Sequence, residues 1–391
     1  MGKYTPKLTQ FALPKQRPFY VQGENMNKRI LIISNSTGGL VNFRLELLIA
    51  LCREYEVIVL SNESGRTEQL KQIGCKLIST NFDRRGTNPI KDMMLINQYK
   101  KQIKQIDPFI ALTYTIKPNA YGGISCAKLG VPYIANVTGL GDSIENAGIL
   151  SKISMMLYKR GLRNAEKVFF QNKTNCDFFV SKGICSVAHD VIPGSGVNLE
   201  KHCFEEYPQS ESPIVISVVG RMIKDKGIEE VLEAAKQLKG RNVLIRLIGH
   251  SGEEYLKKLE NAQNEGIVEY VGLQKNIHEW YKKSHAILHA SYHEGMSNVL
   301  LEASACGRPV LASNIPGCIE TFDEGVSGFG FKPKDAHAIV EAVERFLALP
   351  HDKKAEMGRM ARKKVESEFD RNIVIEKYLT EIRRIEGERN K

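Results

Sequence analysis

The sequence predicts an α/β protein built from two Rossmann-like, doubly wound parallel-sheet domains with a cleft between them. Three observations lead to this prediction. The chain has 391 residues, which is more than one ordinary hydrophobic core accommodates. Short β-branched runs alternate with helical patterns through most of the chain, as in βαβ units with parallel strands. A segment rich in Pro, Gly and Ser divides this alternation into two series.

The first series begins with an apolar strand at Arg29–Ser34 and an amphipathic helix at Val41–Glu54. Its other predicted strands are Glu56–Ser61, Phe109–Thr113, Tyr133–Val137, Lys167–Gln171 and Asp190–Ile192. The second series has strands at Ile214–Gly220, Val243–Ile248, Val268–Tyr270, Ala286–Ala290 and Val310–Ala312, and a helix at Ile228–Lys239. The chain from Ala336 onward is predicted to be helical, with Asp370–Ile385 as its last helix.

These patterns divide the chain into five segments. Residues 1–25 carry three prolines among polar residues and are predicted to be a peripheral extension or an added leader sequence. Residues 26–195 form the N-terminal Rossmann-like acceptor domain, 196–212 a linker, and 213–370 the C-terminal donor domain. Residues 371–391 form a C-terminal helix that we expect to pack back on the N-terminal domain.

Composition limits the classes of function. The net charge of +10 favours anionic partners, but aromatic residues do not interleave with the basic ones, so we expect no nucleic-acid partner. The eight cysteines form no C-x-x-C pair and lie mostly in apolar segments, which is typical of reduced thiols. With no predicted membrane span or signal-peptide core, the sequence favours a cytoplasmic protein.

The strongest motif runs from His293 to Val310 and follows a predicted strand. Gly295 permits a tight turn, and Ser297 or Asn298 can cap the helix that follows. The N–H groups at this helix start suit a diphosphate. Glu294 in the loop and Glu302 inside the helix are candidate ligands of a sugar and a ribose, although a capped helix with two solvated glutamates has the same pattern.

The second motif, Val218–Gly227, also lies between a strand and a helix. Gly220 allows the turn, and Arg221 and Lys226 can reach the same phosphates from a neighbouring strand end. A solvated basic loop is the alternative. Two cations beside a helix terminus favour phosphate binding over that alternative.

Gly-Arg-x4-Lys-Gly followed by Glu-x7-Glu-Ala resembles the retaining family-4 glycosyltransferases of the GT-B fold, from about Arg29 to the C-terminus. The resemblance implies that Arg221 and Lys226 bind the diphosphate of a nucleotide-sugar donor. It also implies that Glu302 binds the donor ribose and Glu294 contacts the transferred sugar, which makes Glu294, Arg221 and Lys226 the catalytic candidates.

The resemblance extends to further binding residues. The donor-binding candidates on glycine loops and backbone turns are Gly38, Gly39, Gly220, Val271, Leu273, Gly295, Met296, Ser297, Asn298 and Val299. The acceptor-binding candidates are Lys117, Asn119, Thr138 and Gly139, in two segments that resemble a branch of the family found in bacterial surface-glycan assembly. The implied donor is a UDP-N-acetylhexosamine or UDP-hexose.

The chain departs from the family pattern in one respect. Many members carry a histidine near the sugar where this chain has Asn136-Val137-Thr138, and no histidine precedes His189. The part of the N-terminal domain before His189 therefore supplies no imidazole base, and we expect the leaving diphosphate to accept the acceptor's proton. No Asp-x-Asp occurs, so we expect no cofactor and no metal. We predict that the histidines at 250, 285, 289 and 293 are core or loop residues.

The expected acceptor is a polyprenyl-diphosphate-linked glycan at the inner face of a bacterial plasma membrane. The stretch Ile149–Lys167 combines apolar residues with five cations, as does a helix lying on an anionic bilayer. A core-packed helix with a basic outer face has the same pattern. Three alternatives stay open: transfer to a small soluble acceptor, a sugar-nucleotide 2-epimerase of the same fold, and an inactive nucleotide-sugar-binding scaffold.

Overall fold

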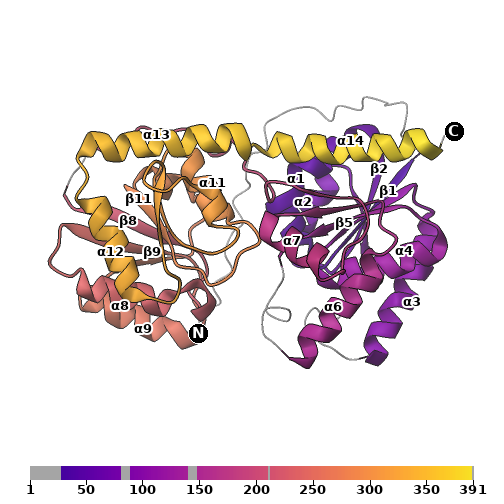
Figure 1. The fold of residues 1–391 in the computed structure, drawn as a ribbon, viewed down its shortest axis with the longest axis horizontal. Coiled ribbons are helices and arrows are strands. Elements are labelled where there is room, and N and C mark those ends of the chain that lie inside the picture. The colour runs from indigo at the N-terminus through magenta and orange to yellow at the C-terminus, as the bar shows by residue number, and fades with distance from the viewer. Residues whose placement is uncertain (1–27, 81–88, 140–147, 210–211, 390–391) are drawn as a thin grey trace, which may run out of the picture.

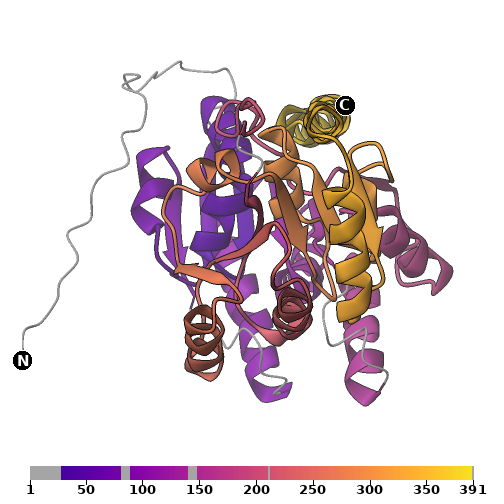
Figure 2. The same ribbon diagram turned by 90° about the vertical axis from the view of Figure 1, so that its left-hand side faces the viewer.

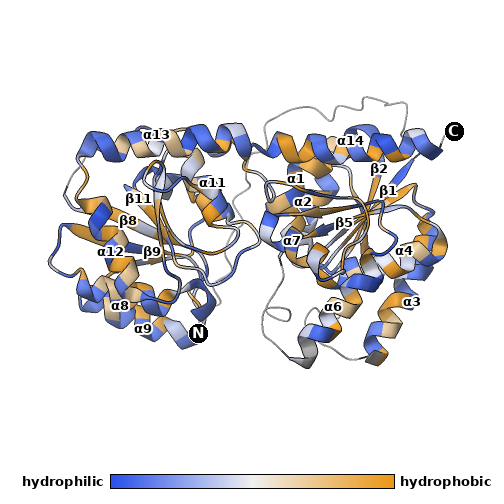
Figure 3. Ribbon diagram, viewed as in Figure 1, coloured by the Kyte–Doolittle hydropathy of each residue, from blue (hydrophilic) through white to orange (hydrophobic). Residues whose placement is uncertain are grey.

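The computed structural model describes residues 28–80, 89–139, 148–209 and 212–389, and it confirms the predicted fold class. Two parallel sheets, each covered by helices, form two domains that lie side by side (Figure 1). The first sheet has the strand order β3-β2-β1-β4-β5-β6-β7, and the second has the order β10-β9-β8-β11-β12-β13. Figure 3 shows the apolar residues concentrated in the strands and on the inner faces of the helices. The prediction that residues 1–25 are a peripheral extension or an added leader concerns residues outside the described ranges.

The N-terminal domain alternates strands and helices along the chain. Its strands are β1 (Arg29–Ser34), β2 (Glu56–Ser61), β3 (Lys76–Ser79), β4 (Ile110–Tyr114), β5 (Tyr133–Val137), β6 (Lys167–Phe170) and β7 (His189–Val191). Its helices are α1 (Thr37–Glu54), α2 (Thr67–Gln72), α3 (Pro89–Ile106), the π-helix η1 (Pro118–Gly122), α4 (Gly123–Leu129), α6 (Ile149–Leu162) and α7 (Lys173–Ser181).

The C-terminal domain repeats this plan. Its strands are β8 (Ile214–Val219), β9 (Val243–Ile248), β10 (Glu269–Gly272), β11 (Ala286–His289), β12 (Val310–Ser313) and β13 (Gly328–Phe331). Its helices are η2 (Lys224–Lys226), α8 (Ile228–Gln237), α9 (Glu253–Asn264), α10 (His278–Lys282), α11 (Asn298–Ala305), η3 (Ile319–Thr321), α12 (Ala336–Leu347) and α13 (His351–Glu368), followed by α14 (Arg371–Arg389).

The structure differs from the sequence prediction mainly at element ends and at the sheet edges. Helix α1 begins at Thr37, a turn earlier than predicted, because Ser36 caps it by accepting a hydrogen bond from the Gly39 N–H. The edge strands β3 and β13 were not predicted, since each has only four residues and β13 contains two glycines.

The two last helices connect the domains. Helix α13 lies along the C-terminal domain, and α14 continues beyond it along the N-terminal domain (Figures 1 and 2). Apolar residues of α14, including Val374, Tyr378 and Ile382, belong to the same core cluster as residues of α1 and β1. The last helix of the chain therefore completes the core of the first domain.

A buried arginine holds the linker against the C-terminal domain. The Arg308 side chain is fully buried and donates to the carbonyl oxygens of Glu205 and Glu206 in the linker, at 3.0 and 2.8 Å. It also donates to the carbonyl of Tyr281, at 3.0 Å. These neutral acceptors satisfy the guanidinium by hydrogen bonding, and within the described chain it forms no ion pair.

We predict that Arg308→Ala lowers the free energy of unfolding by about 3 kcal/mol or more, because it leaves buried carbonyl groups without a donor and creates a cavity. Arg345→Ala is the matched control, since Arg345 is about half exposed and pairs with Glu324 at the surface. Its loss should cost less than about 1 kcal/mol. Urea denaturation of both variants tests this, and equal destabilisation would contradict the role given to Arg308.

Candidate functional site

The two sequence motifs meet at the carboxyl ends of neighbouring strands. β8 and β11 are paired, so the loop after β8 and the loop after β11 leave the same edge of the sheet. Gly220 directly follows β8 with φ +151°, a conformation that residues with side chains rarely adopt, and the space beside it is open. Gly220, Arg221, Lys226 and His289 line a small pocket at this edge.

Lys226 and Glu294 form an ion pair in the centre of the site. The Lys226 ammonium donates to the Glu294 carboxylate and, at 3.3 Å, to the hydroxyl of Ser291. The other neighbour of Glu294 is His289, whose Nε2 lies 2.9 Å from the same carboxylate oxygen. An ammonium has three N–H donors, so one remains for a bound anion.

Glu294 is ionised at physiological pH. Burial opposes its charge, but the hydrogen bond from His289 and the charge of Lys226 lower its pKa to about 2. A carboxyl whose pKa is lowered by folding stabilises the protein above its unfolded pKa, and this contribution is lost as the pH falls toward about 2. The site therefore holds a fixed negative charge beside a fixed positive one.

Arg221 contributes a second cation. Its side chain is exposed, and none of the described residues forms an ion pair or hydrogen bond with its guanidinium. A guanidinium in this position can bind phosphate oxygens in a bidentate manner without first leaving another partner.

The start of helix α11 offers backbone donors to the same site. Ser297 is the N-cap, and its hydroxyl accepts from the Leu300 N–H at 3.4 Å. This leaves the first-turn N–H groups of Asn298 and Val299 to a bound anion. Ser297 and Met296 are themselves buried, so their side chains serve the fold and only their backbone could contact a ligand.

Glu302 lies one turn inside α11 in a largely buried position. Its carboxylate accepts a hydrogen bond from the Tyr281 hydroxyl at 3.0 Å, and burial raises its pKa. His202 lies 3.8 Å away, but burial lowers the pKa of this imidazole to about 3, so it stays neutral and does not compensate the carboxylate. The Glu302 side chain retains 27% exposure, which leaves it accessible to a hydroxyl-bearing ligand.

The predicted base-binding segment, residues 270–273, consists of the end of the edge strand β10 and the residue after it. The Val271 carbonyl accepts from the Gln274 side-chain amide at 2.6 Å, so the turn is closed by its own residues. Leu273 is 74% exposed, the most of any large apolar residue described in this domain. An exposed leucine beside backbone polar groups suits the flat face of a base.

Gly38 and Gly39 stand at the start of α1, in the first turn after β1. The Gly38 N–H donates to the Ser64 hydroxyl at 3.2 Å, and the Gly39 N–H donates to Ser36. A Cβ on Gly38 would meet the Ser64 carbonyl oxygen at 2.9 Å. These N–H groups are satisfied by serines, so a phosphate would bind here only by displacing a serine hydroxyl.

The two domains touch at Gly295, in the loop between β11 and α11. A Cβ on Gly295 would lie 1.9 Å from the Thr138 carbonyl oxygen, and the Gly295 carbonyl accepts from the Asn172 side chain at 2.6 Å. Gly139 faces the same glycine, with its own Cβ position 3.5 Å from the Gly295 Cα. The structure thus brings Thr138 and Gly139 beside Gly295, where they form part of the contact between the domains.

Two acceptor candidates are not placed to contact an acceptor. Asn119 is fully buried, where it accepts from Thr113 and donates to the Asn136 carbonyl, both at 2.7 Å. Its role is to join β4 to β5, which corrects the expectation from the sequence. Lys117 is mostly buried and pairs with Asp92 of α3 at 3.1 Å, so its charge is already compensated.

Several residues of the site were not foreseen. His289 was predicted to be a core histidine, and it is buried, yet it also hydrogen-bonds Glu294. Tyr281 and His202 surround Glu302 from segments that carry no motif. His289 lies at the carboxyl end of a strand, a position that could have indicated a role, whereas Tyr281 and His202 depend on long-range packing.

Family models and curated relatives match both halves of the chain. The model described as glycosyl transferases group 1 matches residues 201–364, and the model described as glycosyl transferase 4-like matches residues 29–172. The N,N'-diacetylbacillosaminyl-diphospho-undecaprenol alpha-1,3-N-acetylgalactosaminyltransferase of Campylobacter jejuni is 27% identical over 372 residues, covering 90% of this chain and 97% of that protein. The capsular polysaccharide biosynthesis glycosyltransferase CapM of Staphylococcus aureus is 31% identical over 186 residues, 44% of this chain and 48% of CapM.

Solved structures share the fold across both domains. The sucrose-phosphate synthase of Thermosynechococcus elongatus superimposes with a TM-score of 0.76 at 18% identity, covering 92% of this chain and 99% of that one. Anabaena HepE, solved with UDP and glucose, superimposes with a TM-score of 0.74 at 18% identity, covering 90% and 98%. At these identities the structural likeness establishes the fold alone.

Proposed function

This chain belongs to the family-4-like glycosyltransferases of the GT-B fold, and we propose that it transfers an N-acetylhexosamine or hexose from a UDP-sugar to a polyprenyl-diphosphate-linked glycan with retention of configuration. The observation that carries this proposal is the pairing of Lys226 with an ionised Glu294 beside Arg221 and the start of α11. The Campylobacter relative, similar over 90% of the chain, supports the class of acceptor.

The donor diphosphate would lie between the β8 and β11 loops. Arg221, the remaining Lys226 donor and the N–H groups of Asn298 and Val299 together offer fixed positive charge to its oxygens. The charge that develops on the diphosphate as the sugar leaves is stabilised by groups already in place. Glu302 would accept hydrogen bonds from the ribose hydroxyls.

Glu294 would face the sugar. As the glycosidic bond to the diphosphate breaks, positive charge develops on the sugar ring, and an ionised carboxylate stabilises it. The acceptor hydroxyl attacks from the side of the leaving diphosphate, which accepts its proton. This route needs no imidazole base, in keeping with the lack of histidine before His189.

We predict that Arg221→Ala and Lys226→Ala each cost about 2–4 kcal/mol of transition-state stabilisation in kcat/KM. Lys226→Ala also leaves Glu294 without its cation, so it should cost more than Arg221→Ala. Steady-state kinetics on folded variants is the measurement. Arg241→Ala is the control, since Arg241 is an exposed arginine paired with Glu344 in the same domain. Activity within a few-fold of the parent enzyme in both variants would reject the diphosphate assignment.

We expect Glu302→Gln to raise mainly the donor KM, because a ribose contact is made equally in the ground and transition states. Glu294→Gln should lower mainly kcat, because its carboxylate meets charge only as the charge develops. Both changes are isosteric. Tyr281 stays beside residue 302, and His289 stays beside residue 294. An intact kcat with only a raised donor KM in Glu294→Gln would remove its catalytic role.

We propose that transfer requires no divalent metal, because Arg221 and Lys226 supply the charge that a metal supplies in other transferases. After treatment with excess EDTA, turnover should stay within about twofold of its starting value, at a temperature well below unfolding. Complete loss of turnover that magnesium or manganese restores would contradict this proposal.

The N-terminal domain presents a surface suited to an anionic bilayer. We define the tip surface as the first two turns of α3 and of α6, which extend beyond the first sheet at the same end of the domain (Figure 1). Its large apolar side chains are well exposed: Ile90, Met93, Met94, Ile153 and Met156. Lys91 and Lys152 lie among them and are exposed. Along α6, Lys159 and Arg160 continue the basic face, and both are exposed.

We propose that this tip surface docks the enzyme on the cytoplasmic face of the bacterial inner membrane. Apolar side chains among cations insert into the interface, while each lysine near an anionic surface adds about 1 kcal/mol. No helix in the described residues is long and apolar enough to cross a bilayer. Peripheral docking would bring the cleft to a lipid-linked acceptor.

We predict that the protein co-sediments with liposomes containing anionic lipid and that high salt weakens this binding. The double variant Ile90→Asp/Met94→Asp should bind at least tenfold more weakly, because it removes two exposed apolar contacts and adds negative charge. Leu256→Asp is the matched control, since Leu256 is an exposed apolar residue on α9 of the other domain. Equal binding by the double variant and its control would reject the tip surface.

The acceptor is tested separately from docking. Free nucleoside diphosphate should appear only when a lipid-linked acceptor is present, which also separates transfer from 2-epimerisation. Equal transfer to a free sugar, together with no liposome binding, would reject the lipid acceptor and leave the donor site standing.

A further inference from the structure

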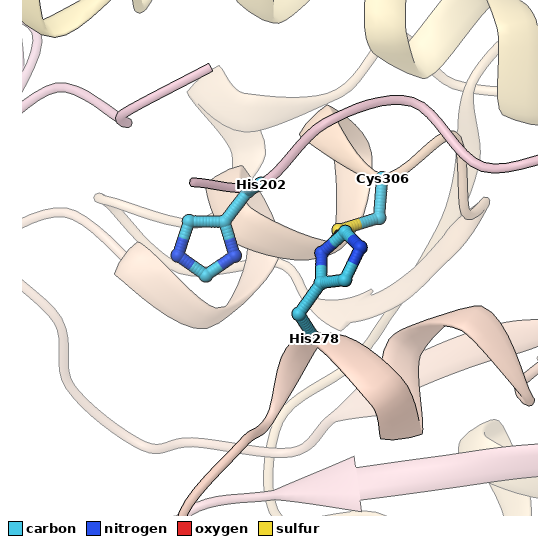
Figure 4. A group of neighbouring side chains, drawn as sticks. All are labelled: His202, His278 and Cys306. Carbon is cyan, nitrogen blue, oxygen red and sulfur yellow. Dashed lines mark hydrogen bonds between the residues drawn. The ribbon is translucent and has the colours of Figure 1, made fainter. Parts of the chain in front are cut away.

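Two histidines and a cysteine converge beneath helix α11, on the side of the linker (Figure 4). His202 comes from the linker, His278 is the first residue of α10, and Cys306 follows the last residue of α11. One ligand atom from each lies within 4.8 Å of the other two. The cluster is distinct from the Lys226–Glu294 pair, although His202 also lies 3.8 Å from the Glu302 carboxylate.

The hydrogen bonds of His278 orient its ring as in a metal ligand. Its Nε2 lies 2.9 Å from the Glu205 carboxylate, so this nitrogen carries the hydrogen and donates. The other nitrogen, Nδ1, then carries a lone pair that accepts a hydrogen bond from the Cys306 thiol, whose sulfur lies 3.3 Å away, and this lone pair could bond an ion once the thiol is deprotonated. A carboxylate that fixes the tautomer and orientation of a ligating imidazole is the usual outer partner of a zinc-bound histidine.

His202 supplies an independent observation. Its side chain is 3% exposed, and its Nδ1 is buried without a hydrogen-bond partner in the described part of the chain. Figure 4 shows a nitrogen of this ring facing His278. Buried polar atoms are nearly always satisfied, so an orphaned imidazole nitrogen beside a thiol and a second imidazole calls for a ligand.

We propose that His202, His278 and Cys306 bind Zn²⁺ or a similar borderline-soft divalent cation. Two imidazoles and a thiolate suit zinc and do not suit magnesium or calcium, which prefer oxygen ligands. On binding, the Cys306 thiol gives up its proton to solvent and its sulfur bonds the ion. Water would occupy a fourth, tetrahedral position. The ion would join the linker to α10 and α11 and so stabilise this side of the donor domain.

A second set of residues shares His278 but is less suited to an ion. Cys203 and Glu205 lie near His278 Nε2. Cys203 is exposed, and Glu205 already pairs with Lys282 at 3.0 Å. Binding there would also separate Glu205 from the nitrogen whose hydrogen it accepts. The geometry therefore favours the buried set that uses Nδ1.

Cobalt is the probe for the site, because thiolate ligation produces a charge-transfer absorption in the near ultraviolet. The metal-stripped full-length chain should take up one equivalent of Co²⁺ with this absorption, and Zn²⁺ should displace the cobalt. Zn²⁺, but not Mg²⁺, should raise the midpoint of thermal unfolding. Cys306→Ser and His278→Gln should abolish the absorption. The controls Cys203→Ser and Cys318→Ser should retain it, since Cys318 is a buried cysteine elsewhere in the same domain.

Two further variants keep the test decisive if Cys306→Ser does not fold. His202→Asn should abolish tight zinc binding measured by competition with a chromophoric chelator. Glu205→Gln should weaken it by about 10–100-fold, as is usual for loss of an outer partner. Absence of zinc binding above the level of His202→Asn would overturn the proposal. Absorption that is lost in Cys203→Ser but kept in Cys306→Ser would also overturn it. None of these measurements depends on glycosyl transfer.

Discussion

The site depends on one constraint: the Glu294 carboxylate carries a negative charge where it has little access to water. An unpaired buried carboxylate is costly, and here Lys226, in the loop after β8, and His289, at the end of β11, both bond the Glu294 carboxylate, which stands in the loop after β11. Those loops meet only because β8 and β11 are neighbours in a parallel sheet, although some seventy residues separate them in sequence. The strand order of the C-terminal domain is thus what brings two short motifs together into a single charged site.

The contact between the domains bears on the same loop. Gly295 lies so close to Thr138 that no side chain fits between them, and its carbonyl is held by Asn172 of the N-terminal domain. The loop that carries Glu294 is therefore positioned from both sides of the cleft. A change in the angle between the domains would therefore act on the loop that carries Glu294 through its contacts with Thr138 and Asn172.

Much of this arrangement could be predicted from the sequence, and the parts that could not share a physical cause. Strands such as Arg29–Ser34 and Tyr133–Val137 were predicted with their observed bounds, because local periodicity determines them. The Lys226–Glu294 pair was not foreseen, since each residue was assigned to a different ligand group and pairing depends on tertiary proximity. Asn119 was assigned to acceptor binding because its segment resembles a branch of the family, and the sequence carries no sign that its side chain is buried.

Helix α14 has a consequence for how the chain can be recombined and synthesised. It comes after the C-terminal domain in the chain, yet its apolar face completes the core of the N-terminal domain. During translation the core of the N-terminal domain would be complete only after residues 371–389 have been synthesised. The two domains would therefore reach their folded state together. For the same reason, a chimera that exchanges acceptor halves between relatives would have to carry α14 along with the N-terminal half, and its breakpoints would fall both in the linker and near Asp370.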